Sequence, residues 1–270
     1  MLKLKNEKID LIKIGGSVIT NKSKYKTLRE EQLECISKEI AQWDRKCIII
    51  HGAGSFGHII ADQYSIHHGF DNQDQLKGIL QIRTDMNELS EIVKNKLIKS
   101  GIQALNFQTS SIVFETVNGF FVYTEPLEKA LSLGLYPVLS GDVLFTENND
   151  FGIISGDVLA YLLSQKITIG RVIFITDVDG LYVQDNFTKE KELVKSISLE
   201  NLETLVISEL NQVSSKDVTG GMQGKISEIK KLLEYVSEVI LVNGFHPERL
   251  ASIRKGEDFI GTRLINKNST

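Results

Sequence analysis

A glycine-rich stretch, His51–Gly57, and the histidine that follows it, His58, carry residue types suited to binding an anion. The stretch comes directly after the apolar run Cys47–Ile50, which is typical of a buried strand. Three glycines and one alanine leave backbone N–H groups unshielded, and such loops at helix N-termini bind phosphate groups. Because His58 falls where the next helix is expected to begin, its side chain would lie within reach of that anion. The alternative is structural, since a glycine turn can serve close packing alone.

Two further glycine clusters make phosphate chemistry the favoured interpretation. The expected strand Ile9–Ile14 contains Lys13 and leads into Gly15–Ser17. A lysine within an apolar strand is costly unless it is paired, and this ammonium could reach over the glycine turn to a phosphate. The third cluster, Thr219–Lys225, opens another expected helix and also contains a lysine.

Neither of the two common nucleotide-binding signatures describes these loops. The P-loop pattern GxxxxGK[ST] does not occur in the chain. The spacing of Gly52, Gly54 and Gly57 matches GxGxxG literally, but a lone match is weak evidence. The histidines on either side of the loop suit phosphate better than a dinucleotide, so a Rossmann-type oxidoreductase is disfavoured.

The composition is that of an ordinary globular protein and argues against several functional classes. Of the 270 residues, 41% are hydrophobic and 24% are charged, and the formal net charge is −4 at pH 7. This charge gives no basic surface, so we expect no nucleic-acid partner. No signal-peptide pattern and no apolar run near eighteen residues occurs, so we expect a cytoplasmic protein without a membrane partner. Cys35 and Cys47 are expected to be buried thiols rather than a disulfide or a metal-binding pair.

Strand-like and helix-like segments alternate along most of the chain, which predicts an α/β fold with a largely parallel sheet covered by helices. Two expected hairpins, turning at Asn118-Gly119 and at Asn148–Asp150, interrupt the alternation and predict a mixed sheet. Two apolar stripes at helical spacing are expected to face the core. The stripes are Leu33, Ile36, Ile40 and Trp43, and Leu76, Ile79, Ile82, Met86, Leu89 and Val93.

Acidic residues follow several of the expected strands. Asp142 and Asp157 flank the second hairpin, and Asp177 follows the clean strand Arg171–Ile175. Taken singly, aspartates in such positions often cap helices or close turns. Ligands of open α/β sheets bind at the carboxyl ends of strands, however, so Asp157 and Asp177 become candidates for a functional site.

Several of these segments occur together, in this order, in the amino acid kinase superfamily, which the chain resembles from about Leu11 to Leu264. They are Lys13–Ser17, the second glycine loop, Thr176–Gly180 and Thr219–Met222. Within the superfamily the chain is most similar to the isopentenyl phosphate kinases. The features that carry this closer similarity are Lys22, His58, Ile154–Asp157 and Phe259–Thr262.

The resemblance implies an open α/β/α sandwich that forms a single amino acid kinase domain over residues 1–270. An N-lobe of about residues 1–165 would bind the phosphoryl acceptor, and a C-lobe of about residues 166–270 would bind ATP. The implied reaction is direct transfer of the γ-phosphoryl group to isopentenyl phosphate, by a homodimer and without a covalent intermediate. Mg²⁺ would accompany ATP, held mainly by phosphates and water, because the sequence shows no dedicated carboxylate cage and no metal-ligating residue is predicted.

The resemblance also implies roles for the charged residues. Lys13 and Lys225 would hold the β- and γ-phosphates of ATP, and Lys22 would neutralise the group in transfer. Asp157 would position the lysines. His58 would hydrogen-bond the acceptor phosphate without acting as a general base, because a phosphate monoester dianion is already nucleophilic near neutral pH.

Backbone groups and an apolar groove would complete the implied site. The remaining residues implied for ATP are Gly15, Gly16, Ser17, Gly54, Asp177, Gly180, Tyr182 and Gly220. The acceptor phosphate would meet the backbones of Ala53 and Gly156. The apolar candidates for its tail, each of which could instead be plain core, are Ile79, Ile82, Met86, Ile59 and Ile153. Ala53 and Ile59 depart from the family pattern, which has glycine and proline at these positions.

Two alternatives stay open, one within the same superfamily and one from another functional class. A phosphonate kinase of the fosfomycin-resistance type shares the histidine and the lysines, but the apolar stripe at Ile79, Ile82 and Met86 favours a prenyl substrate. A non-catalytic module that binds nucleotide for regulation is disfavoured because all three lysines and His58 are present.

Overall fold

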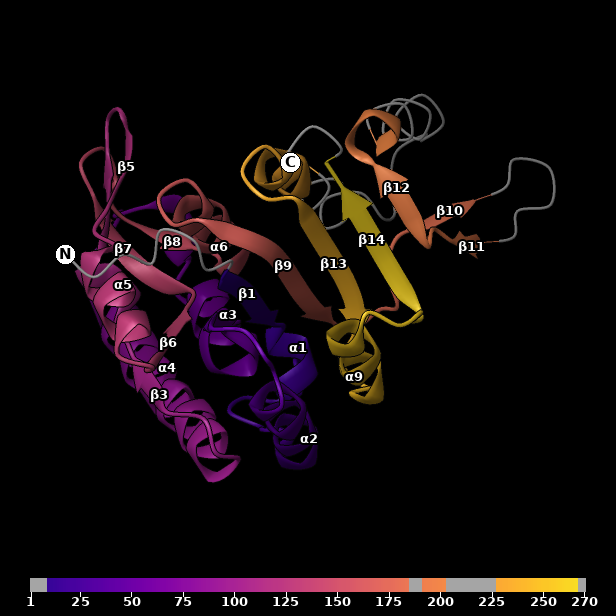
Figure 1. Cartoon of the computed structure of the whole chain (residues 1–270). Helices are drawn as coiled ribbons and strands as arrows, with labels where there is room; N and C mark the ends of the chain where they lie inside the picture. Colours follow the sequence, from indigo (N-terminus) through magenta and orange to yellow (C-terminus); the bar gives the residue numbers. More distant parts are fainter. Residues whose placement is uncertain (1–8, 185–190, 203–226, 267–270) are drawn as a thin grey trace.

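Residues 9–184, 191–202 and 227–266 are described by the computed structural model of the chain. Within them, a central sheet of eight strands has helices on both faces (Figure 1). Neighbouring strands of this sheet are parallel except β13 and β14, which pair antiparallel. In order across the sheet the strands are β12 (Ser196–Ser198), β14 (Gly261–Ile265), β13 (Glu238–Asn243), β9 (Ile169–Thr176), β1 (Ile9–Ile14), β2 (Cys47–His51), β6 (Tyr136–Ser140) and β3 (Ala104–Asn106). The expected α/β class with a largely parallel sheet is confirmed.

The central strands β1 and β2 are buried on both faces. Their short apolar runs are rich in isoleucine, whose β-branched side chain suits a strand that is covered on both sides. Successive side chains point to opposite faces, so Ile12 packs into one helical layer and Leu11 into the other. This packing fixes the direction in which β1 delivers Lys13 and the glycine loop that follows it.

Two layers of helices cover the central sheet and make the fold an α/β/α sandwich. The first layer consists of α1 (Gly16–Ile19), α2 (Glu30–Ala41), α3 (Gly54–Gln63), α4 (Asp74–Lys99) and α9 (Glu248–Lys255). The second layer consists of α5 (Glu125–Ser132), α6 (Gly156–Ser164) and helical residues 227–233. Two short 3₁₀ helices, η1 (Ile66–His68) and η2 (Thr109–Ser111), lie in the connections.

Both expected hairpins are present, but they form a sheet of their own. Strand β4 (Val113–Thr116) pairs antiparallel with β5 (Gly119–Val122), and β7 (Asp142–Thr146) pairs antiparallel with β8 (Asp150–Ile154). Because β4 also pairs with β7, the four strands bond to one another and none adds to the central sheet. The mixed sheet expected from these hairpins is therefore present, since β4 and β7 pair parallel, but it is separate from the central sheet. A separate pair, β10 (Tyr182–Gln184) and β11 (Lys191–Leu193), is antiparallel.

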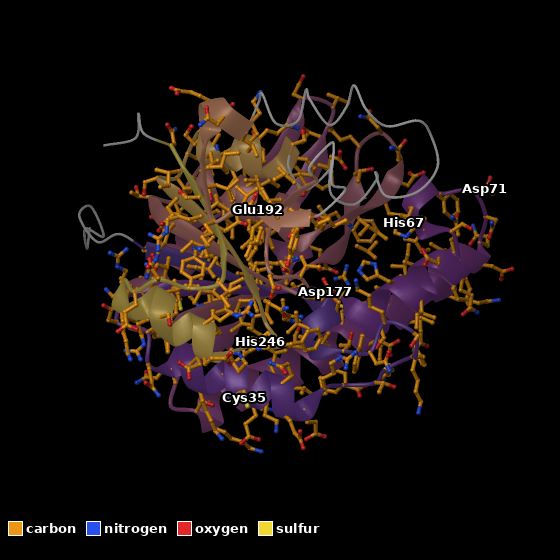
Figure 2. The ribbon with its side chains drawn as sticks, turned by 90° about the vertical axis from the view of Figure 1, so that its right-hand side faces the viewer. Cys35, His67, Asp71, Asp177, Glu192 and His246 are labelled. Carbon is orange, nitrogen blue, oxygen red and sulfur yellow. The ribbon has the colours of Figure 1, made fainter. Side chains whose placement is uncertain are left out.

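Two expectations about side-chain burial are wrong. Leu76 is 42% exposed in the first turn of α4, because Gln75 takes the buried position there and donates to the carbonyl oxygens of Ser65 and Gly69. Cys35 is exposed on the outer face of α2 (Figure 2). The other members of both apolar stripes are buried.

The two cysteines do not form a disulfide. Cys47 is buried on β2, and this burial raises the pKa of its thiol.

Candidate active site

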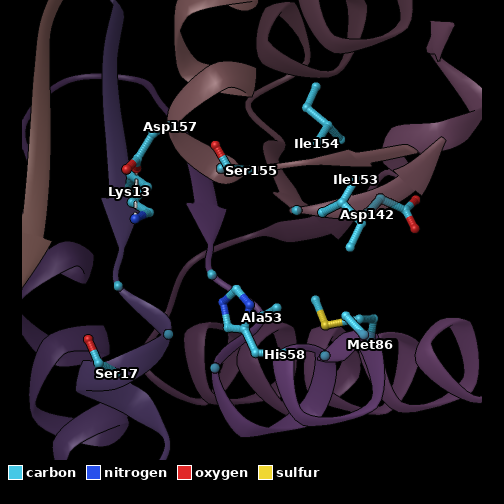
Figure 3. A pocket seen from close by; sticks show the side chains of 18 of the residues that line it. Lys13, Ser17, Ala53, His58, Met86, Asp142, Ile153, Ile154, Ser155 and Asp157 are labelled. Atoms are coloured by element: carbon cyan, nitrogen blue, oxygen red, sulfur yellow. Dashed lines mark ion pairs between the residues drawn. The ribbon is translucent and has the colours of Figure 1, made fainter. Parts of the chain in front are cut away.

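A cavity of about 330 Å³ opens at the carboxyl ends of the parallel strands β1, β2, β6 and β9. Parallel strands bring these ends to one edge of a sheet, which is where open α/β folds bind ligands. The junction between β8 and α6 closes another side of the cavity (Figure 3). The residues expected to be functional that line it are Lys13, Gly15, Gly16, Ser17, Lys22, Ala53, Gly54, His58, Ile82, Met86, Ile153, Gly156, Asp157 and Asp177.

The first two glycine loops touch each other through their backbones. A Cβ atom added to Gly16 would lie 2.3 Å from the backbone nitrogen of Gly54, and one added to Gly52 would lie 2.5 Å from that of Gly16. Gly54 also has a φ of +50°, which L residues rarely adopt. Thr20 joins the loops, because its Oγ1 accepts the N–H of Ser55 at 2.9 Å and donates to the carbonyl of Gly16 at 2.7 Å. The glycines are thus required for packing, and that packing brings both loops to one cavity.

Two helices begin at the cavity. α3 begins at Gly54, and its N-cap residue, Ala53, makes no side-chain hydrogen bond to the first turn. α6 begins at Gly156, and the hydroxyl of Ser155 accepts the N–H of Val158 at 3.1 Å. Since the N-terminus of a helix carries partial positive charge and unpaired N–H groups, both ends favour an anion in the cavity.

Lys13 is held at the end of β1 with only 12% of its side chain exposed. Its Nζ lies 2.7 Å from Oδ1 of Asp157, a carboxylate that is 20% exposed (Figure 3). The ring centroid of Phe174 lies 6.0 Å from the same Nζ. Gly156 packs beside Lys13, because a Cβ added there would lie in ordinary contact with Cε of the lysine, at 3.4 Å, and closer to Cγ2 of Ile50, at 3.1 Å. The lysine in the apolar strand is therefore paired, as its burial requires.

Lys22 and Asp177 form a second, more exposed ion pair across the cavity. Nζ of Lys22 lies 3.2 Å from Oδ2 of Asp177, and the side chains are 65% and 41% exposed. Burial alone would raise the pKa of Asp177, but the Lys22 ammonium and a hydrogen bond from Ser17 outweigh it and lower that pKa below its ordinary value. Exposed pairs of this kind contribute at most about 1 kcal/mol, so Lys22 can exchange its carboxylate partner for a phosphate at little cost.

His58 lies in the first turns of α3, and its imidazole lines the cavity beside Ala53 (Figure 3). His58 is an exposed residue that lines the cavity, and neighbouring protein partly removes its ring from water. This partial removal from water lowers its pKa, and the positive charges of Lys22 and Lys13 act in the same direction, opposed by Asp62. His58 is therefore neutral at pH 7, with one nitrogen able to donate and the other to accept a hydrogen bond.

The opposite wall of the cavity is apolar. Ile82 and Met86 come from α4, and Val143 and Ile153 come from the β7–β8 hairpin. Ile79 is also buried, but it packs into the core and is not among the residues that line the cavity. Of the α4 residues expected to contact the acceptor tail, Ile82 and Met86 therefore line the cavity, whereas Ile79 does not.

Gly180 ends the turn after Asp177 and Tyr182 begins β10, and neither lines the cavity. A Cβ added to Gly180 would lie 2.3 Å from Oγ1 of Thr262, so close packing accounts for this glycine. The hydroxyl of Tyr182 donates to Asp179 at 3.0 Å, and a hydrogen bond from Arg249 is the largest contribution that lowers the pKa of Asp179 to about 2.

Two of the residues expected to bind ATP, Gly220 and Lys225, lie outside the residues that the structure describes.

Some residues of the site were not assigned a role from the sequence. Asp142 lines the cavity although it is 4% exposed, and it accepts hydrogen bonds from the backbone N–H of Ser110 at 3.0 Å and from Gln108 at 2.9 Å. The repeated tripeptide Ser-Gly-Asp, which ends at Asp142 and at Asp157, was a usable signal. Thr20 had no comparable signal, because its function depends on a contact between two loops that are distant in sequence.

Residues 9–184, 191–202 and 227–266 contain no group of three or more His, Cys, Asp or Glu side chains arranged as metal ligands. In the same ranges, no helix has both the length and the apolar character needed to cross a bilayer.

Lysines, a neutral histidine and glycine loops at the carboxyl edge of a parallel sheet are the elements of a site for phosphoryl transfer, which depends on positioning and charge neutralisation. The protein is thus a phosphotransferase by fold and site. It belongs to the amino acid kinase family, whose family model matches residues 8–243.

Relatives of known activity are similar over nearly the whole chain. Isopentenyl phosphate kinase of Thermoplasma acidophilum is 34% identical over 253 residues, which cover 93% of this chain and 98% of that protein. Isopentenyl phosphate kinase of Methanothermobacter thermautotrophicus is 33% identical over 269 residues, or 96% and 99% of the two chains. The crystal structure of the T. acidophilum product complex matches with a TM-score of 0.78 and 30% identity, over 95% and 99% of the chains. The resemblance inferred from the sequence is confirmed.

Proposed function

We propose that this protein transfers the γ-phosphoryl group of ATP to isopentenyl phosphate, producing isopentenyl diphosphate and ADP. The family assignment and the full-length similarity to isopentenyl phosphate kinases support the proposal. One observation in the structure carries it further: the cavity that contains Lys13, Lys22 and His58 also has an apolar wall. An acceptor with a phosphate head and a hydrocarbon tail matches a cavity that has cationic and imidazole groups on one side and an apolar wall on the other.

The main obstacle to the reaction is electrostatic, because both reactants are anions. Lys13 and Lys22 bring two ammonium groups to one cavity, and the loops around Gly16 and Gly54 add backbone dipoles. Such groups are most effective where water is excluded and where they are positioned before the reaction begins. The ion pair with Asp157 keeps Lys13 in place without filling the cavity.

His58 orients the acceptor phosphate rather than removing a proton from it. A phosphate monoester has a second pKa of about 6, so the dianion is already a competent nucleophile at pH 7. The neutral imidazole donates one N–H to a phosphate oxygen. Its position beside Ala53 and the start of α3 places this donor at the same end of the cavity as the helix N-terminus.

The prenyl tail lies against the wall formed by Ile82, Met86, Val143 and Ile153. Burial of each methylene contributes about 0.8 kcal/mol, so a five-carbon tail supplies several kcal/mol of binding that a small polar acceptor lacks. This difference favours a prenyl phosphate over a phosphonate such as fosfomycin.

The nucleotide side of the site extends the proposal to residues that do not line the cavity. We assign the adenosine portion of ATP to the C-terminal half of the domain, near Asp177, Gly180 and Tyr182, with Gly220 and Lys225 completing the site. Bound ATP supplies the phosphoryl group, and the accompanying Mg²⁺ neutralises phosphate charge. Mg²⁺ would be held mainly by phosphates and water. The homodimer remains a prediction.

The proposal is tested by measuring kcat/KM with Mg-ATP and five acceptors: isopentenyl phosphate, dimethylallyl phosphate, geranyl phosphate, fosfomycin and UMP. We expect the five-carbon prenyl phosphates to exceed fosfomycin and UMP by at least about tenfold, or about 1.4 kcal/mol in transition-state binding. A preference for fosfomycin would contradict the assignment of the apolar wall. Absence of transfer to all five acceptors would contradict the proposed activity.

A further inference from the structure

The segment that carries Lys22 is a closed loop rather than an extended chain. Thr20 and Leu28 form an isolated antiparallel bridge at its base. The N–H of Asn21 donates to the carbonyl of Thr27 at 2.8 Å, and the N–H of Lys24 donates to that of Asn21 at 3.1 Å. Movement of one part of this loop therefore moves Lys22 as well.

A buried carboxylate on α4 holds the far side of this loop. Asp85 is 0% exposed and accepts a hydrogen bond from the hydroxyl of Tyr25 at 2.5 Å. Nζ of Lys26 lies 3.2 Å from the other oxygen of the same carboxylate. Gln81 donates to both oxygens, at 3.0 and 3.1 Å, and Glu88 is a second partner of Lys26. Among the residues that the structure describes, the other two hydrogen-bond partners of Asp85, Tyr25 and Lys26, both belong to the loop.

The loop adopts an unfavourable backbone conformation where Asp85 holds it. Lys26 has a φ of +49°, which costs free energy for a residue that is not glycine. Contacts with α3 support the same place, because the N–H of Lys26 reaches the carbonyl of Ser55 at 3.4 Å and the N–H of Thr27 reaches its hydroxyl at 3.2 Å. The carboxylate and α3 together fix a loop geometry that the local sequence does not favour.

The position of Asp85 in α4 connects this loop to the acceptor side of the cavity. Asp85 is the neighbour of Met86 and lies three residues after Ile82, and both of these apolar residues line the cavity. One turn of α4 therefore bears the wall assigned to the acceptor tail and the anchor of the loop that carries Lys22.

We propose that Asp85 is a positioning residue, which holds the Thr20–Leu28 loop on α4 so that Lys22 meets the phosphoryl group in transfer. This inference rests on the proposed function, since Lys22 acts there by neutralising the transferring group. Asp85 is not among the residues that line the cavity. Its effect should therefore appear in kcat, through the position of Lys22, more than in the KM for ATP.

The test compares Asp85→Asn with Glu88→Gln, which also removes one carboxylate charge beside Lys26 from the same helix. Glu88 is exposed, and its side chain does not bond Tyr25. We expect Asp85→Asn to lower kcat by about ten- to a hundredfold, because small displacements of a catalytic group have effects of this size. The kcat of Glu88→Gln should stay within about twofold of the kcat of the unaltered protein. Equal effects of the two variants would overturn the proposal.

A double variant separates positioning from general destabilisation. In a Lys22→Met background, Asp85→Asn should change kcat by less than about twofold, because residues that act through one another are not additive. If the losses in kcat caused by Lys22→Met and by Asp85→Asn instead multiply in the double variant, the proposal is overturned.

If Asp85→Asn does not fold, Tyr25→Phe gives the same comparison, because it removes one hydroxyl from a side chain that is 42% exposed. It should lower kcat by about threefold or more, and an unchanged kcat would count against the proposal.

Hydrogen exchange provides a readout that does not depend on activity. The amides of Asn21, Lys24, Lys26 and Thr27 are all hydrogen-bonded in the loop or to Ser55. Asp85→Asn should accelerate their exchange by about tenfold or more, and Glu88→Gln should not. Unchanged protection in Asp85→Asn would overturn the anchoring role. If the unaltered protein does not phosphorylate isopentenyl phosphate, the proposed function fails, while this exchange experiment still tests the anchor.

Discussion

The buried imidazole of His51 makes a quantitative prediction about the pH dependence of stability. His51 is 0% exposed at the end of β2, directly before the second glycine loop. Its Nε2 lies 2.9 Å from Oγ of Ser90 on α4, and its Nδ1 lies 3.2 Å from the carbonyl oxygen of Gly52. Burial lowers its pKa to about 4, so the folded protein holds this imidazole neutral.

The sign of the effect follows from proton binding. In the unfolded chain His51 titrates near its ordinary pKa of 6.5, whereas in the folded protein it titrates near 4. Between these values the unfolded state binds a proton that the folded state does not, so the free energy of unfolding falls as the pH falls. At 1.36 kcal/mol per pH unit, the loss between pH 7.5 and pH 4.5 is about 2.5 kcal/mol.

The assay is urea unfolding of the unaltered protein and of His51→Gln at several pH values between 7.5 and 4.5. Glutamine does not titrate, so the difference between the two curves isolates His51 from the other acidic and basic groups. The difference should be largest at pH 7.5 and shrink by about 2.5 kcal/mol at pH 4.5. Ser90→Ala serves as the control, because it leaves His51 buried and should keep the pH dependence of the unaltered protein. A constant difference between the unaltered protein and His51→Gln would refute the reasoning.

Three further predictions concern the cavity itself. Lys22→Ala should lower kcat by about 10²–10³-fold, as removal of one charge-stabilising donor does, while the urea midpoint stays unchanged because the ion pair is exposed. His58→Ala should lower kcat/KM for isopentenyl phosphate by about a hundredfold, and turnover like that of the unaltered protein would remove His58 from the mechanism. Gly16→Ala should destabilise the fold by about 1–3 kcal/mol in urea unfolding, because the new Cβ would meet the backbone of Gly54. Gly152→Ala is its control, since its nearest contact would be an ordinary 3.6 Å, and equal stability of the two variants would contradict the packing argument.

The sequence carried enough local information to predict the central fold and the cationic side of the site. β1, β2 and β9 are short apolar runs that need no distant partner to be recognised as buried strands. The glycine loops follow them directly, and parallel strands place those loops at one edge. Lys13 was identifiable because a charge within an apolar strand requires a partner, although the sequence did not show the 2.7 Å geometry with Asp157.

Features that depend on contacts between distant segments could not be predicted in the same way. Lys22 and Asp177 are 155 positions apart, and no periodic pattern joins them. Periodicity placed Ile79 and Ile82 on the same face of α4, but it could not show that only Ile82 reaches the cavity. Asp85 had a weak signal, a carboxylate within the apolar stripe of α4, and its partners in the loop before α2 became visible only in three dimensions.

The central claim is that the protein transfers the γ-phosphoryl group of ATP to a prenyl phosphate. ³¹P NMR of the complete reaction tests this claim most directly. The protein, Mg-ATP and isopentenyl phosphate are mixed, and the phosphorus signals of all reactants and products are followed together. Isopentenyl diphosphate should accumulate in equal amount to ADP, and Lys22→Ala should slow both signals alike. ADP accompanied by inorganic phosphate, with isopentenyl phosphate unchanged, would contradict the account.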